Sequence, residues 1–364
     1  MDNPVATNHV LNGSMDVPEL TGNTRNLSAD AARLVFFVKH MELIGIPLIV
    51  TIGLTGNVLS AFIFLRQKLR KLSCSLYLAA RAISDTGFLL CIFVLWLQHL
   101  RVPLIHTQGV CQVEIFLSYL CGFLSVWFIV WVTVENYYRI CHPFKVSAFC
   151  TVKKAMFMIM LTSLIGCMIY SFSTWTNGII IKNEKSYCFM IQRFEIINTA
   201  LTYVDCLITL AIPSAIILLI TGRIIYSIMK TYRKRGADMR KGSGQLQTKV
   251  TRMLFWVSFT FLVLNIPSHI VRLRAVVELM TKQTTDSSPT IYLIQHVLQM
   301  IYYLSFAVNF FIYISLGPSF RNTFLEIFCK PCLLNSKSKG CRMEMKTEGV
   351  SMENTAENLL SEEC

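Results

Sequence analysis

Three charged residues interrupt long apolar stretches of this 364-residue sequence, and they are the first candidates for chemistry. Arg81 and Asp85 are four positions apart, a spacing that places two side chains on one face of a helix. Asp205 is the single charged residue of the stretch 196–221. A charge in an apolar environment is costly, so such residues usually bind an ion, a ligand or one another. No set of His, Asp, Glu, Ser or Lys residues has catalytic spacing, so the sequence does not predict an enzyme.

The apolar stretches around these charges are long enough to cross a membrane. Only 15% of the residues are charged, whereas a typical soluble protein has about 25%, and 54% are hydrophobic, with a mean hydropathy of +0.52. The charges gather between seven apolar runs, each near or above the ~20 residues that a membrane helix needs. The sequence therefore predicts an all-α fold, a seven-transmembrane helix bundle, followed by a short amphipathic helix.

The charges between the runs predict the orientation of the chain. The segments 66–71, 139–154 and 223–252 hold more Lys and Arg than the segments on the other side, and positive residues favour the cytoplasmic side. This places the N-terminus outside the cell, where the sequons at Asn12 and Asn26 would be glycosylated. The net charge of +13 then follows from topology, and nucleic-acid binding is not predicted.

Two of the 13 cysteines, Cys111 and Cys188, fall on the predicted outer side. That side is oxidising, so we expect a disulfide between them, which would tie the loop before the fifth run to the start of the third. Cys329 and Cys332 follow the last run on the inner side, where palmitoylation is expected. The segment 179–189 holds β-branched and aromatic residues around a polar turn, which predicts a short hairpin.

The seven runs, the outer N-terminus and this cysteine pair resemble the rhodopsin-like G-protein-coupled receptors over residues 40–330. The motifs that carry the resemblance are Gly56-Asn57, Asp85, Pro213, Phe261 before Pro267, and Asn309 to Tyr313. The halves of the chain show no internal repeat, which disfavours a transporter.

The resemblance implies a cell-surface receptor in the plasma membrane that binds an extracellular ligand and signals through heterotrimeric G proteins. Arrestin would be a further partner, recruited by a phosphorylated tail. The domains implied are a disordered extracellular tail at 1–40, a receptor domain at 41–330 with an amphipathic helix at 318–330, and a disordered cytoplasmic tail at 331–364.

The sequence departs from the family at its switch residues. The third-helix motif reads Glu135-Asn136-Tyr137, so Asn136 stands where the family has an arginine, and Asn265 replaces the sixth-helix tryptophan. The seventh-helix motif ends at Tyr313 but lacks its proline, which resembles invertebrate receptors for FMRFamide-like peptides. Two functions stay open: a neuropeptide receptor that activates a G protein, and an atypical receptor of the same fold that binds ligand but couples weakly.

The resemblance also implies a polar centre around Asp85 that holds a sodium ion or water, since carboxylate and hydroxyl oxygens suit a hard cation. Its other members are Asn57, Ser125, Ser305 and Asn309. Arg81 stands where the family has an apolar residue. We expect it either to pair with Glu135 or Asp85, partly replacing the missing arginine, or to extend toward the lipid headgroups.

A ligand cavity is expected between this centre and the outer side. Its polar lining would comprise Gln98, Glu114, Ser118, Tyr119, Asp205, His269, Arg272, Gln295, Gln299 and Tyr303. The carboxylates could meet a cationic group, and the guanidinium a carboxylate or an amide. By resemblance, an acidic residue at Ser118 would mark an amine receptor and a lysine at Tyr303 a retinal protein, so both are disfavoured. The predicted hairpin at 179–189 resembles that of peptide receptors of the family, in which it leaves the cavity open, and this implies a peptide ligand. The alternative is hydrogen bonding between helices, least expected for Asp205, the only charge in its run.

Overall fold

The computed structural model describes residues 29–182, 185–235, 252–267, 269–270 and 289–328. Several residues that the sequence singles out lie outside this part of the chain: Asn12, Asn26, Arg272, Cys329 and Cys332. The predicted tail 331–364 and most of the predicted tail 1–40 lie outside it as well.

The described chain consists of helices and one hairpin. The main helices are α1 (Ala29–Phe64), α2 (Ser73–Trp96), α3 (Val110–Cys141), α5 (Val152–Tyr170), α7 (Glu195–Cys206), α8 (Ile212–Arg235), Arg252–Pro267, α10 (Pro289–Ala307), α11 (Asn309–Leu316) and α12 (Pro318–Phe328). The short turns are η3 (Leu97–Leu100), η4 (Leu104–His106), η5 (Pro143–Lys145), α4 (Val146–Phe149), α6 (Ser173–Thr176), η6 (Gln192–Phe194) and the π-helical η7 (Leu207–Ala211). The hairpin pairs β1 (Asn177–Lys182) with β2 (Lys185–Met190).

Each predicted membrane run corresponds to a helix. Five described helices are long and apolar enough to cross a membrane, and the pair Leu293–Ala307 and Asn309–Leu316, bent by 46°, makes a sixth span. Arg252–Pro267 is a shorter apolar helix at the position of the remaining run. The prediction of a multi-pass helical bundle is confirmed.

The first helix begins earlier than its apolar run. α1 starts at Ala29, so residues 29–40, which were predicted to belong to a disordered tail, are helical. Hydropathy marks where the chain becomes apolar, whereas a helix continues wherever its backbone bonds and side chains allow it. Ala29, Ala31 and Ala32 favour a helix, and the charges of Asp30 and Arg33 do not oppose one.

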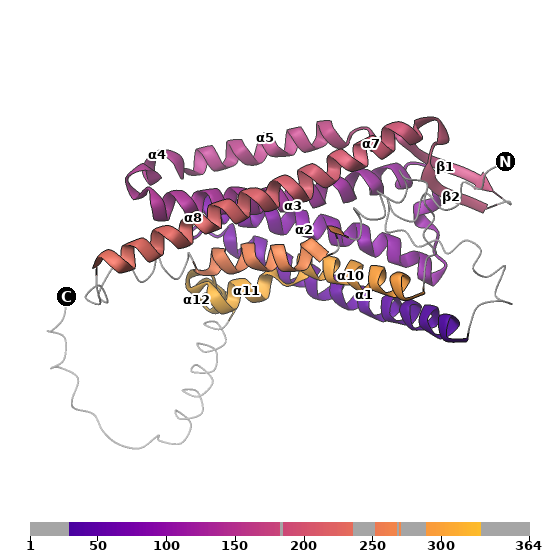
Figure 1. The fold of residues 1–364 in the computed structure, drawn as a ribbon, viewed down its shortest axis with the longest axis horizontal. Helices are drawn as coiled ribbons and strands as arrows, with labels where there is room; N and C mark the ends of the chain where they lie inside the picture. Colours follow the sequence, from indigo (N-terminus) through magenta and orange to yellow (C-terminus); the bar gives the residue numbers. More distant parts are fainter. Residues whose placement is uncertain (1–28, 183–184, 236–251, 268, 271–288, 329–364) are drawn as a thin grey trace, which may run out of the picture. The chain divides into compact units, whose positions relative to one another are not determined.

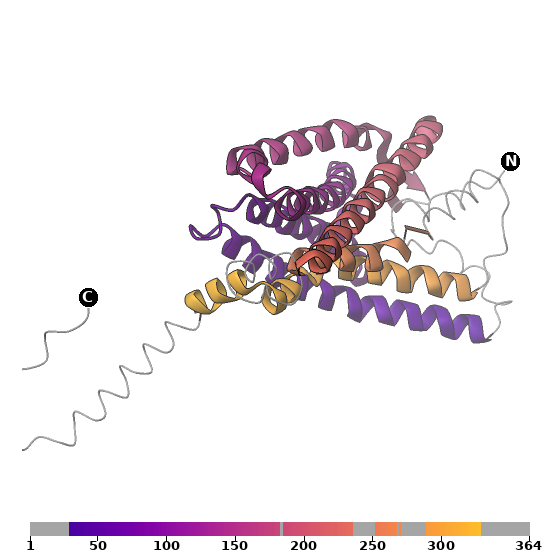
Figure 2. The same cartoon turned by 60° about the vertical axis from the view of Figure 1, so that its left-hand side comes forward.

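α3 packs against helices on several of its sides. It contacts α2, α5 and α8, whereas α1 packs against α2 and α10 (Figure 1). The turned view in Figure 2 shows α1 and α10 running side by side. Buried apolar clusters join these helices: Phe88, Tyr302 and Phe306 link α2 to α10, and Phe123 and Tyr170 link α3 to α5.

The faces turned away from these contacts expose large apolar side chains. Phe157 and Met160 of α5 and Leu219 of α8 are 63%, 69% and 72% exposed. Such a surface would be unfavourable in water but meets acyl chains in a bilayer. The helices therefore carry apolar side chains both toward the bundle and away from it, which agrees with the absence of charged residues from the apolar runs.

Candidate functional site

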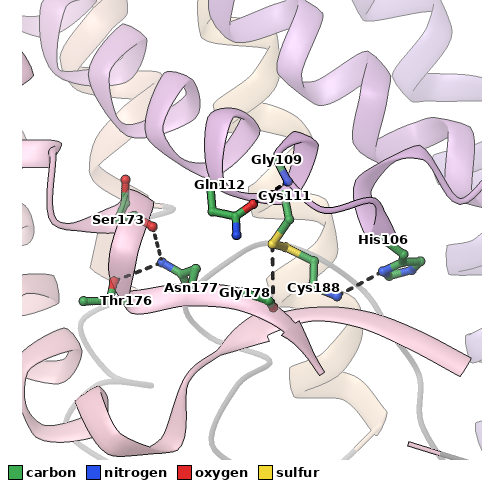
Figure 3. The surroundings of a disulfide bond; sticks show 9 residues. All are labelled: His106, Gly109, Cys111, Gln112, Ser173, Thr176, Asn177, Gly178 and Cys188. Carbon is green, nitrogen blue, oxygen red and sulfur yellow. Dashed lines mark hydrogen bonds between the residues drawn. A yellow bond between two sulfur atoms is a disulfide. The ribbon is translucent and has the colours of Figure 1, made fainter. Parts of the chain in front are cut away.

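The hairpin is bound to the start of α3. Cys188 of β2 is disulfide-bonded to Cys111 in the first turn of α3, with 5.6 Å between the Cα atoms (Figure 3). The backbone N–H of Cys188 also donates to Nδ1 of His106 in η4, at 3.1 Å. Within the hairpin, Ile179 lies opposite Cys188. The predicted disulfide and hairpin are confirmed, and we call this end of the bundle the hairpin end.

A cavity lies among α2, α3, the α7–η7 segment and α10. Its empty space, including its open mouth, is about 700 Å³. The structure brings seven of the ten predicted ligand residues to its wall: Glu114, Ser118, Tyr119, Asp205, His269, Gln299 and Tyr303.

Other predicted residues lie elsewhere, and some lining residues were not predicted. Gln98 lies in η3 and Gln295 in α10, and neither is at the wall. The remaining lining residues are mostly apolar: Phe88, Ile92, Leu95, Ile115, Gly122, Phe123, Val126, Thr209 and Tyr302. Helical spacing could have revealed part of this set, because Phe88, Ile92 and Leu95 follow Asp85 on one face of α2.

Two carboxyl groups stand in the cavity wall. Glu114 is 6% exposed, and its Oε1 accepts a hydrogen bond from Ser118 at 2.9 Å. Asp205 is 4% exposed, and its Oδ1 accepts one from the buried Tyr170 hydroxyl at 2.6 Å. Asp205 therefore makes a helix-to-helix hydrogen bond, although the sequence made such a bond least expected for this residue. The hydroxyl of Ser118 cannot balance a negative charge on Glu114, so this part of the wall is suited to a cationic group.

A π-helical turn positions Asp205 and Thr209. The extra residue in η7 releases a backbone carbonyl, and Trp127 Nε1 of α3 donates to Ile208 O at 3.0 Å. Pro213, four residues after Thr209, has no N–H to continue the ladder. Such turns occur often at functional sites. Here the turn lets both Asp205 and Thr209 face the cavity.

Asp85 is the centre of a buried network below the cavity. Ser125 of α3 donates to its Oδ1 at 2.5 Å, and Asn309 Nδ2 of α11 donates to its Oδ2 at 2.9 Å. Asn57 of α1 donates to Phe306 O at 2.8 Å, which ties α1 to α10 beside this network. Helices α2, α3 and α11 are thus joined through one carboxylate.

The residues predicted for a sodium site surround Asp85 and bond to one another. Each oxygen of Asp85 accepts one hydrogen bond, and the amide of Asn309 is oriented with its N–H₂ group toward Oδ2. The Ser305 hydroxyl donates to Tyr302 O at 2.7 Å and lies 3.4 Å from Asn265 Oδ1. The residues predicted for the sodium site are close together, but their hydrogen bonds are those of a closed polar cluster.

A comparison of the sequence with known families decides the identity. The model of the 7 transmembrane receptor (rhodopsin family) matches residues 56–313, which span the cavity wall and the Asp85 network. The chain belongs to this receptor family. The resemblance seen in the sequence is confirmed, and the protein is a multi-pass membrane receptor, not an enzyme.

The receptor is also similar to several curated proteins. Human neuromedin-U receptor 2 is 25% identical over 312 residues, covering 80% of this chain and 72% of the relative. The neuromedin U receptor homolog nmur-2 of Caenorhabditis elegans is 23% identical over 320 residues, 79% of each chain. The sex peptide receptor-related protein 2 of the same species is 25% identical over 240 residues, 57% of this chain and 51% of the relative. The similarity to receptors for FMRFamide-like peptides stays a prediction.

The receptor's Glu135 has partners close to it in sequence and in space. Its Oε2 accepts a hydrogen bond from Ser73 of α2 at 2.7 Å and lies 3.4 Å from Arg139 Nη2, one turn further along α3. Asn136 is 3% exposed. Arg81, the partner considered from the sequence, pairs with Asp85 instead, at 3.7 Å.

The receptor's other predicted switch residues also make local contacts. Asn265 Nδ2 donates to Phe261 O at 2.8 Å, a bond within one helix. Tyr313 is 1% exposed and packs its ring against Phe64, whereas Tyr137 lies 3.2 Å from His142 Nε2. These residues stabilise one packed arrangement, and their part in switching stays a prediction.

Proposed function

We propose that the receptor is activated by an extracellular peptide that enters the cavity from the hairpin end, and that it signals through a heterotrimeric G protein. The observation that carries this proposal is the buried carboxyl group of Glu114, which meets only the neutral hydroxyl of Ser118 within the described contacts of the cavity wall. A cationic group of a peptide would give it a charge-assisted bond. The names of the relatives, receptors for neuromedin U and a sex peptide receptor-related protein, support a peptide.

The apolar part of the wall supports the same ligand class. Phe88, Ile92 and Tyr302 surround the polar group with aromatic and aliphatic surface. A few placed polar groups in an apolar cavity usually fix the orientation of a ligand, whereas the apolar surface supplies affinity. A peptide terminus with one cationic and one apolar side chain matches both parts of the wall.

The experiment expresses the full chain with a promiscuous G protein and measures calcium release after addition of a library of amidated peptides. For an active peptide, Glu114→Gln should raise the half-maximal concentration by roughly 30-fold or more, because a buried charge pair loses one partner. In an analogue of that peptide, the cationic side chain is replaced by a neutral one of similar size. This analogue should have the same half-maximal concentration on the wild type and on Glu114→Gln.

Two results would contradict parts of the proposal. If Glu114→Gln raises the half-maximal concentration of the peptide and of its neutral analogue by the same factor, Glu114 does not meet the cation. Saturable binding of the labelled peptide without a response from any G protein would show that the receptor binds but does not couple.

A further inference from the structure

The guanidinium of Arg81 lies beside the Asp85 carboxylate, deep between the helices. The two side chains are 3% and 1% exposed, and 3.7 Å separates Arg81 Nε from Asp85 Oδ2. Nε and Nη1 of Arg81 are buried and make no hydrogen bond with any described residue. The alternative that Arg81 extends to the lipid headgroups is therefore wrong, and the pair is held mainly by attraction between opposite charges.

The other groups around this pair come from three helices. Ser125 of α3 and Asn309 of α11 donate to the two oxygens of Asp85. Tyr313 of α11, 1% exposed, lies within interaction range of Arg81. The positive charge thus stands where α2, α3 and α11 meet, and it is attached to α2 through its own side chain.

A buried carboxylate is tolerated only with a positive charge or strong donors close by. Arg81 supplies that charge at all times, because a guanidinium does not lose its proton in a protein. A sodium ion on Asp85 would lie within a few ångströms of the guanidinium, where two positive charges repel strongly in a medium of low dielectric. It would also have to compete with the hydrogen bonds that Ser125 and Asn309 already donate to that carboxylate.

We infer that Arg81 is a tethered cation that takes the place of a sodium ion at Asp85, so that the core of this receptor does not bind sodium. A diffusible ion can leave when the helices move, but a side chain cannot. Rearrangement of α11 against α2 must then change the contacts of Arg81 with Asp85 and Tyr313, and the sodium concentration has no influence on that equilibrium.

The test needs neither a ligand nor a G protein. The purified full chain is melted in a series of NaCl concentrations, with choline chloride keeping the ionic strength constant, and a thiol-reactive dye reports the exposure of buried Cys74, Cys91 and Cys121. The Tm of the wild type should be the same throughout. Arg81→Leu frees the carboxylate, so its Tm should rise saturably with sodium by about 2–5 °C.

Two variants serve as controls. Arg81→Lys keeps a positive charge and should remain insensitive to sodium, whereas Arg81→Leu combined with Asp85→Asn should lose the sodium response that Arg81→Leu gains. A saturable rise in the Tm of the wild type with sodium would overturn the inference, as would an Arg81→Leu protein that melts identically in both salts. If Arg81→Leu does not fold, Arg81→Gln gives the same neutral site, and the wild-type titration is decisive by itself.

Discussion

The hydrogen bond from Tyr170 to Asp205 joins a fully buried hydroxyl to a buried carboxylate at 2.6 Å. Tyr170→Phe keeps the ring, which stacks on Tyr119 at 5.5 Å, and removes the donor. A buried charged acceptor that loses a donor costs about 1–3 kcal/mol. We therefore expect the Tm of the purified receptor to fall by roughly 2–6 °C.

The matched control is Tyr226→Phe in α8. This tyrosine is 61% exposed on the outer face, so the same chemical change should leave the Tm within about 1 °C of the wild type. Equal losses in Tyr170→Phe and Tyr226→Phe would mean that the bond does not stabilise the fold.

At the scale of single residues, the sequence reveals buried charges more readily than their partners. A charge in an apolar run is visible by itself, but Tyr170 precedes Asp205 by 35 positions and comes from another helix. No local pattern links the two. The pair Glu135–Arg139 was predictable, because its spacing of four is that of Arg81 and Asp85.

Among the elements, α1 contains a proline without a break in the helix. Pro47 has no N–H, so the carbonyl of Leu43, four residues earlier, lacks its helical partner. Trp96 at the end of α2 supplies one, since its Nε1 donates to Leu43 O at 3.2 Å. The carbonyl that Pro47 leaves without a helical partner in α1 therefore accepts a hydrogen bond from α2.

A double-mutant cycle tests this contact. Trp96→Phe removes the donor and should lower the stability of the wild type by about 1 kcal/mol, in addition to the loss of indole packing. In a Pro47→Ala background the backbone N–H of residue 47 can donate to Leu43 O. Trp96→Phe should therefore lower the stability by less in this background than in the wild type. The difference in Tm loss between the two backgrounds isolates the hydrogen bond from packing. Equal losses would show that Trp96 acts through packing alone.

The elements themselves were predictable, but their irregular points were not. The apolar runs predicted the spans, and the β-branched and aromatic residues around a polar turn predicted the hairpin. The bend of 46° between α10 and α11 has no proline at its break. At this break, Asn309 Nδ2 donates to Ser305 O and to Asp85 Oδ2. The second bond depends on α2, which local sequence does not show. The π-helical turn η7 likewise depends on Trp127 of another helix, which local sequence does not show.

For the whole molecule, the disulfide and the number of spans together favour one orientation. Four spans, Arg33–Phe64, Ser73–Leu100, Val110–Cys141 and Val152–Thr176, precede the hairpin. An even number of crossings puts the start of α1 and the hairpin on the same side of the membrane. Because disulfides persist in oxidising compartments, the Cys111–Cys188 bond favours the outside for both. The excess of Lys and Arg in the segments of the opposite side agrees with this orientation.

This orientation predicts where the chain can carry glycans. In cells, treatment with an N-glycosidase should lower the apparent mass of the wild type, and the double variant Asn12→Gln with Asn26→Gln should show no such shift. The matched control is Lys241→Asn in that double variant, because Gly242 and Ser243 complete the same triplet that begins at Asn12. One further span separates position 241 from the hairpin, so this new sequon should face the cytoplasm and stay unmodified. A glycan on the Lys241→Asn protein, together with none on the wild type, would require the opposite orientation and would place the cavity mouth inside the cell.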